Sequence, residues 1–166
     1  MPWSKIIPAH RIPPRDCALI EPMSVGFHAV SRAQVTDIDI VMVIGCGMIG
    51  MGAIVRSALR GATVIAVDLD DEKLELAKRI GAHHTINSMT ENVHECLTKI
   101  TEGLGPDVVI EAVGSPATYV MAVNEVGFTG RVVCIGYAKS EVSFQTKYFV
   151  QKELCLLYTS PSPRDR

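Results

Sequence analysis

The sequence predicts an α/β fold in which helices cover both faces of a parallel β-sheet. From residue 40 onward, short runs rich in β-branched residues alternate with amphipathic helical segments. The strand-like runs show little polar alternation, which is typical of parallel strands that are buried on both faces. Repeated β-α-β units of this length favour right-handed crossovers and a doubly wound sheet.

The order of the elements follows from apolar spacing and from residues that start or stop helices. Helical segments are expected to end at Gly61 and Gly81, and Pro116 is expected to open another helix. The expected strands are residues 40–44, 63–67, 84–86, 107–110 and 131–135. The expected helices are residues 49–59, 71–80, 91–101 and the segment after 116.

The first 35 residues differ from the rest of the chain. Residues 1–16 contain four prolines and are predicted to form an extended loop. Residues 18–32 are predicted to be helical, with Pro22 in the first turn. We interpret residues 1–35 as a remnant of another domain that ends in a linking helix, and residues 36–154 as the sheet domain.

Composition and charge exclude several classes of protein. The 48% hydrophobic residues suffice for a buried core, and the net charge of −2 argues against a nucleic-acid partner. The longest uncharged stretch, residues 40–55, is too short and too rich in glycine to span a bilayer. No signal peptide is recognised, and the five cysteines form no CxxC pair, so reduced thiols in a cytoplasmic protein are expected. Apolar neighbours are expected around Cys46, Cys134 and Cys155.

The strongest chemical signal is the turn Gly45-Cys46-Gly47-Met48-Ile49-Gly50, between a predicted strand and a predicted helix. The first glycine permits a tight turn, the second lets a pyrophosphate approach the backbone, and the third lets helix and strand pack closely. The N–H groups at the helix start then face the phosphates. This context predicts a Rossmann-type dinucleotide-binding domain.

An acidic residue at the end of the second predicted strand supports this interpretation. Asp68 follows the glycine turn by about 20 residues, where a carboxylate accepts hydrogen bonds from the adenosine ribose. It would repel a 2′-phosphate, and residues 69–71 supply no arginine to bind one. NAD is therefore favoured over NADP. The alternative is a doubly wound sheet in which the acid is coincidental.

Three segments together resemble the medium-chain zinc-type alcohol dehydrogenases. They are residues 19–33, the glycine turn with its strand (43–50) and residues 67–70. Within that family the chain is most similar to the sorbitol and sugar-acid dehydrogenase branch, and the resemblance covers residues 17–154.

The resemblance implies roles for individual residues in binding NAD. Met48 and Ile49 would join the three glycines at the pyrophosphate, and Lys73 would lie beside Asp68. Residues 111–114 and 135–137 resemble segments at the ends of the fourth and fifth strands that lie near the cofactor, and Val25 would lie near the nicotinamide ring. The residues in these two segments assigned to the cofactor are Val113, Gly114, Ile135, Gly136 and Tyr137.

Glu21 is the one candidate metal ligand. In the polyol branch a Glu-Pro dipeptide places a carboxylate beside the catalytic zinc, and a carboxylate suits zinc as a direct or outer ligand. The alternative is an ordinary first-turn acid that is stabilised by the helix dipole. His28, His83, His84 and His94 are expected to have structural roles.

The chain departs from the family at both ends. The resemblance implies a catalytic domain with a cysteine zinc ligand, a Gly-His-Glu motif and a four-cysteine zinc lobe, none of which the sequence contains. We therefore expect a fragment from which most of that domain is missing. Residues 155–166 resemble translated sequencing adapter and are expected to be a non-native tail, whose apolar start can imitate a strand.

The expected activity of the parent protein is reversible hydride transfer between NAD and a secondary alcohol that zinc polarises. The resemblance implies a polyol, sugar or sugar-acid substrate, and a homo-oligomer in which residues 141–144 pair across subunits. Two alternatives stay open. One is a non-catalytic NAD(H)-binding fragment. The other is a zinc-free quinone or enoyl reductase, which would prefer NADPH.

Overall fold

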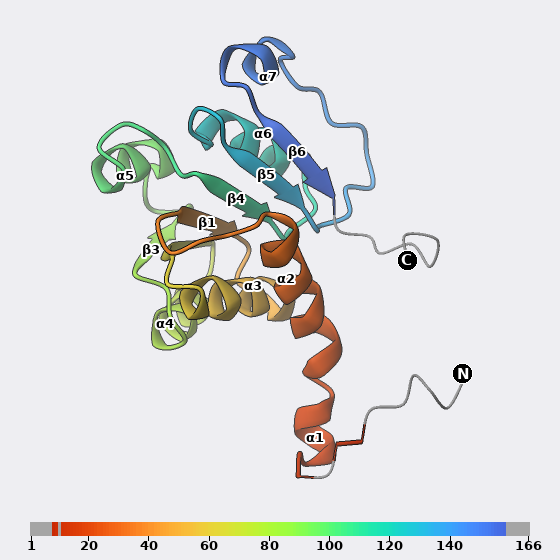
Figure 1. The fold of residues 1–166 in the computed structure, drawn as a ribbon. Coiled ribbons are helices and arrows are strands. Elements are labelled where there is room, and N and C mark those ends of the chain that lie inside the picture. Colours follow the sequence, from red (N-terminus) through yellow and green to blue (C-terminus); the bar gives the residue numbers. More distant parts are fainter. Residues whose placement is uncertain (1–7, 10, 159–166) are drawn as a thin grey trace.

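Six parallel strands form one sheet in the order β3-β2-β1-β4-β5-β6 (Figure 1). The computed structural model describes residues 8–9 and 11–158. The strand order reverses between β1 and β4, and ligands of doubly wound sheets bind at the carboxyl ends of strands at such a point. The strands are β1 (Ile40–Ile44), β2 (Thr63–Asp68), β3 (His84–Asn87), β4 (Val108–Glu111), β5 (Arg131–Cys134) and β6 (Cys155–Tyr158).

Most helices lie where the sequence predicts them. They are α1 (Pro14–Cys17), α2 (Ile20–Arg32), α3 (Met48–Leu59), α4 (Asp71–Arg79), α5 (Val93–Ile100), α6 (Pro116–Glu125) and α7 (Lys147–Gln151). The extended loop predicted for residues 1–16 is wrong at its end, where Pro14 opens a short helix because its ring presets the helical φ. α5 begins later than predicted, because the Asn92 side chain caps it at the Glu95 N–H.

Alternation along the strands divides the core into two layers. Val41 and Val43 point to the face that α2, α3 and α4 cover. Met42 and Ile44 point to the opposite face, where α5 and α6 pack. All four side chains are buried, so the inner strands are apolar on both faces, as the sequence predicts. The prediction of a doubly wound α/β sheet is confirmed.

Two glycines allow α2 and α3 to cross at close range. A Cβ atom on Gly26 would overlap the Ile49 carbonyl oxygen and lie 2.5 Å from the Ala53 nitrogen. A Cβ atom on Gly52 would lie 2.7 Å from the Met23 carbonyl oxygen. This crossing holds the C-terminal part of α2 on the sheet domain, while α1 and the start of α2 extend away from it (Figure 1).

A buried ionic contact connects the segment after α2 to the start of β5. The Arg131 guanidinium donates to the Ala33 carbonyl oxygen at 2.7 Å and pairs with the Asp39 carboxylate. That carboxylate also accepts the Thr36 N–H at 2.7 Å. Residues 92 positions apart in the chain are thereby joined at one edge of the domain.

The sheet ends at β6, which pairs in parallel with β5. Leu157 packs against the core, whereas Cys155 is exposed, so the apolar surroundings expected for this cysteine are wrong. The segment interpreted as a tail therefore begins with a strand, and residues 159–166 lie outside the described residues. Among the described residues, no helix is long and apolar enough to cross a membrane.

Candidate functional site

The glycine turn between β1 and α3 has the geometry that each glycine was expected to provide. Gly45 has a φ of +94°, which favours glycine, and its N–H donates to the Val67 carbonyl oxygen at 2.8 Å. A Cβ atom on Gly50 would overlap the Gly45 carbonyl oxygen. Gly47 is the N-cap of α3, and a Cβ atom there would meet no atom within 4 Å. The turn thus presents open backbone at Gly47 and tight packing at Gly50.

Asp68, the last residue of β2, faces this turn. One carboxylate oxygen accepts the Cys46 N–H at 2.6 Å. The other accepts the N–H groups of Leu69 at 2.8 Å and Asp70 at 3.1 Å. The Lys73 ammonium group lies 3.8 Å from the same carboxylate. These hydrogen bonds order the two loops around Asp68. Its side chain is still 12% exposed and lines the cavity beside the loops.

Cys46 lies in the same turn but does not have the properties of a reactive thiol. Burial, reinforced by the charge of Asp68, raises the pKa of Cys46 to about 12. The thiolate is the reactive form of cysteine, so this side chain stays a small buried hydrophobic group at neutral pH. This agrees with the structural role expected for it.

A cavity of about 630 Å³ opens at the carboxyl ends of the strands, and its volume falls in the range of sites for cofactors and small molecules. Five predicted residues line it: Gly45, Gly47, Asp68, Lys73 and Val113. The sequence reasoning missed other lining residues, among them Leu69, Ser88, Ser115, Thr118 and Met121. Their signal was present, because each lies shortly after a predicted strand or in the first turns of the helix that follows.

The remaining predicted cofactor residues lie around this cavity and do not line it. Met48, Ile49 and Gly50 form the first turn of α3. Gly114 packs on Tyr137, since a Cβ atom on Gly114 would lie 2.6 Å from the Tyr137 nitrogen. The others also lie outside the cavity wall: Gly136 packs beside Gly114, Ile135 contacts the core, and Val25 lies on α2 next to Gly26. Their roles in cofactor binding stay predictions.

Glu21 lies in the first turn of α2 and is exposed. Within the described part of the chain, no group of three or more His, Cys, Asp or Glu side chains could hold a metal ion. The residues present therefore do not make a zinc site, and the metal role of Glu21 stays a prediction. His83 has a structural role, because its Nδ1 accepts the Val64 N–H at 3.0 Å.

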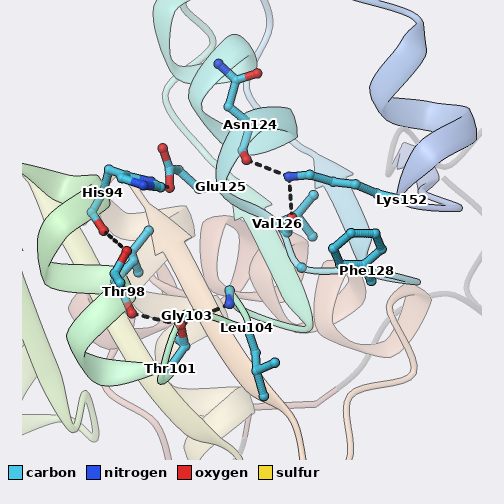
Figure 2. Close-up of a pocket in the computed structure, with 13 residues that line it drawn as sticks. His94, Thr98, Thr101, Gly103, Leu104, Asn124, Glu125, Val126, Phe128 and Lys152 are labelled. Atoms are coloured by element: carbon cyan, nitrogen blue, oxygen red, sulfur yellow. Dashed lines mark hydrogen bonds and ion pairs between the residues drawn. The ribbon is translucent and has the colours of Figure 1, made fainter.

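A second, smaller pocket of about 160 Å³ lies between the C-terminal ends of α5 and α6 (Figure 2). The Lys152 ammonium group donates to the carbonyl oxygens of Asn124 and Val126 at 2.7 and 2.8 Å. His94 bonds to Glu125 at 2.8 Å, and this hydrogen bond raises the pKa of His94. Lys152 thus caps the C-terminal end of α6, and the charged groups that line this pocket already have partners within the protein.

A sequence model of the zinc-binding dehydrogenases matches residues 49–161. The chain belongs to this family. Relatives among the zinc-binding dehydrogenases include D-xylulose reductase from Scheffersomyces stipitis, which is 42% identical over 141 residues, 84% of this chain and 39% of the relative. Erythritol/L-threitol dehydrogenase from Mycolicibacterium smegmatis is 38% identical over 133 residues, 80% of this chain and 37% of the relative.

Solved structures of dehydrogenases share the fold. Galactitol-1-phosphate dehydrogenase from Escherichia coli superimposes with a TM-score of 0.82 at 31% identity, covering 95% of this chain and 47% of that one. A short chain alcohol dehydrogenase from Escherichia coli, complexed with NADH, superimposes with a TM-score of 0.83 at 27% identity, covering 92% and 45%. This chain therefore spans less than half the length of the relatives it matches.

Proposed function

We propose that this chain is the NAD-binding part, residues 36–154, of a zinc-type dehydrogenase that transfers hydride between NAD and a secondary alcohol. The observation that carries the proposal is the joint position of the glycine turn and Asp68 on one cavity. A phosphate-binding helix start and a ribose-binding carboxylate are the two requirements for holding an adenine dinucleotide.

Each residue has a defined part in this binding. The backbone at Gly47 leaves space for the pyrophosphate at the start of α3. Asp68 accepts hydrogen bonds from the adenosine ribose, and the nearby Lys73 ammonium group stabilises the negative charge of that carboxylate. NAD, when bound, supplies the hydride acceptor, and the protein orients it and shields one face of it from water.

Polyols, sugars or sugar acids are the proposed substrates of the intact parent. The printed names of the similar proteins support this, since they include reductases and dehydrogenases of xylulose, erythritol and sorbitol. Among residues 8–9 and 11–158 there is no group of three or more potential metal ligands, and Glu21 is the one zinc ligand proposed for this chain. No catalytic step is therefore assigned to residues of this chain.

The second candidate function is NAD(H) binding without catalysis by the chain on its own. The observation that supports this candidate is the cavity, whose lining includes the glycine turn and Asp68 assigned to the cofactor. A direct assay of the purified chain with NAD, zinc and a panel of polyols separates the two functions. Turnover above the protein-free control excludes a purely binding role, whereas NADH binding without turnover supports it.

Replacing Asp68 with serine is expected to weaken NADH binding about tenfold or more. Hydrogen bonds to a charged group are worth about 1.5–3 kcal/mol, and the shorter side chain no longer reaches the ribose. NADPH is expected to lose less, because the repulsion between carboxylate and 2′-phosphate disappears. Fluorescence titration of both reduced cofactors measures the two dissociation constants.

Glu75→Ser provides the control for this substitution. Glu75 is an exposed acid on α4 that does not line the cavity, so its replacement removes the same charge without touching the site. It is expected to leave both affinities unchanged. Equal affinity of the unmodified chain for NADH and NADPH would contradict the role given to Asp68.

The parent is further proposed to be a cytoplasmic homo-oligomer without nucleic-acid or membrane partners. Residues 141–144, which the resemblance implies pair across subunits, pair with no strand of the described sheet. A segment without a strand partner can add to the sheet edge of a second copy of the chain. Sedimentation at several protein concentrations measures this association.

A further inference from the structure

Glu111, the last residue of β4, is a fully buried carboxyl group beneath the turn that leads into α6. Its Oε1 accepts the N–H groups of Val113 at 3.0 Å and Gly114 at 2.8 Å. The same oxygen accepts the Thr118 hydroxyl at 2.8 Å. One side-chain oxygen thereby fixes both the turn after β4 and the first turn of α6.

The backbone of Glu111 holds the neighbouring loop as well. Its carbonyl oxygen accepts the N–H groups of Ile135 at 2.8 Å and Gly136 at 3.0 Å. Gly136 is packed so closely that a Cβ atom on it would lie 2.7 Å from Glu111 Oε2. The Tyr119 hydroxyl donates to the Gly136 carbonyl oxygen at 2.5 Å. The loops after β4 and β5 are therefore both anchored on one residue.

These loops belong to one half of the carboxyl edge of the sheet. In doubly wound folds each half of the sheet binds one mononucleotide of the cofactor. Asp68 and the glycine turn occupy the half formed by β1 and β2, which takes the adenosine part. Val113 and Thr118 line the same cavity from the β4 side, together with Asp68 and Leu69, so a ligand whose ribose is held by Asp68 also lies against this wall.

The buried position of Glu111 has a cost that an apolar residue would avoid. Its second oxygen, Oε2, is buried without a hydrogen-bond partner among the described residues. Such an oxygen destabilises the folded state, whereas an apolar side chain of similar volume would not. What the carboxyl group provides in return is the acceptor for three donors that shape the cavity wall.

We propose that Glu111 is a positioning residue that holds the β4-side wall of the NAD cavity. This inference rests on the proposed function. Glu111 is fully buried and does not line the cavity, so it has no direct contact with the cofactor. It acts through the backbone of Val113 and Gly114 and through the start of α6. Its loss therefore affects every ligand that lies against this wall.

The test compares Glu111→Met with Glu111→Gln in the purified chain, using NADH and ADP as the two ligands. Methionine keeps the volume but provides no strong acceptor, whereas glutamine keeps one carbonyl oxygen for the three donors. Glu111→Met is expected to weaken the binding of both NADH and ADP about tenfold, because both ligands lie against this wall. Glu111→Gln is expected to restore NADH affinity to within about threefold of the unmodified chain.

Glu125→Met is the matched control, because Glu125 is the last residue of α6 and lines the other pocket. It is expected to bind both ligands as the unmodified chain does. Equal NADH affinity of the methionine and glutamine variants of Glu111 would overturn the inference. So would unchanged ADP affinity in Glu111→Met, because ADP lies against the same wall.

Two further outcomes have definite meanings. If Glu111→Met does not fold by circular dichroism, Thr118→Val removes one of the three donors and must show a smaller loss of affinity for both ligands. Unchanged NADH affinity in Thr118→Val overturns the inference. If the unmodified chain binds no NADH, the proposed function fails, and the inference fails with it. If the unmodified chain and both Glu111 variants bind NADH equally well, the inference fails while the proposed function stands.

Discussion

Alanine in place of Gly50 is expected to abolish NADH binding and to destabilise the domain. Alanine in place of Gly47 is expected to weaken NADH binding without destabilising the domain. A Cβ atom on Gly50 overlaps the Gly45 carbonyl oxygen, so α3 must move away from the turn. The N–H groups at the start of α3 then no longer converge on one phosphate position. Overpacking of this kind costs about 1–3 kcal/mol in stability, in addition to the lost binding.

Gly47 separates the two effects. An added Cβ atom there meets nothing within 4 Å, and the φ of −73° suits alanine. Gly47→Ala should therefore unfold at the same temperature as the unmodified chain, but its methyl group occupies the space proposed for the pyrophosphate. Thermal unfolding and NADH titration of both variants measure stability and binding independently. Normal NADH affinity in Gly47→Ala would contradict the proposed pyrophosphate position.

The second large effect is expected at the crossing of α2 and α3. Gly26→Ala should lower the free energy of unfolding by about 1–3 kcal/mol, because the new methyl group meets the backbone of α3 and not a mobile side chain. For a domain of this size, each kcal/mol corresponds to about 2–4 °C in Tm. Differential scanning calorimetry measures the shift.

Ser24→Ala serves as the reference for the crossing. Ser24 is exposed on the same helix, where its hydroxyl donates to the Glu21 carbonyl oxygen at 2.7 Å. Its replacement should change the Tm by less than about 2 °C, as is usual for surface positions. A Gly26→Ala variant that is as stable as Ser24→Ala would show that α2 does not need this close approach. Gly52→Ala provides an independent second measurement from the α3 side.

The sequence predicts the inner strands and the turn at Gly45 well, because their signals are local. Val41 to Ile44 are apolar on both faces, and this pattern identifies a parallel strand without knowledge of its neighbours. The glycine spacing with Asp68 indicates a shared site, since parallel strands bring their carboxyl ends to one edge. Both predictions depend on properties of the fold class rather than on particular contacts.

What the sequence did not indicate depends on contacts between distant residues. Glu111 looks like the end of a strand followed by a loop, and only the folded chain shows that three donors converge on one of its oxygens. The short helix α7 was not expected either, because its five residues have little apolar periodicity. Its position depends on packing between Phe149 and Phe144, whose ring centroids lie 6.0 Å apart.

The contact of Arg131 with Ala33 and Asp39 has a consequence for how the domain assembles. The linking segment before β1 is fixed by a residue of β5, so its anchorage is completed only after most of the sheet has formed. Contacts of such long range are typical of chains that fold more slowly, because the intervening chain must be ordered before they form. A shortened chain that stops before β5 would lose this anchorage of the linking segment. Whether the segment before β1 is anchored therefore indicates whether the sheet has formed as far as β5.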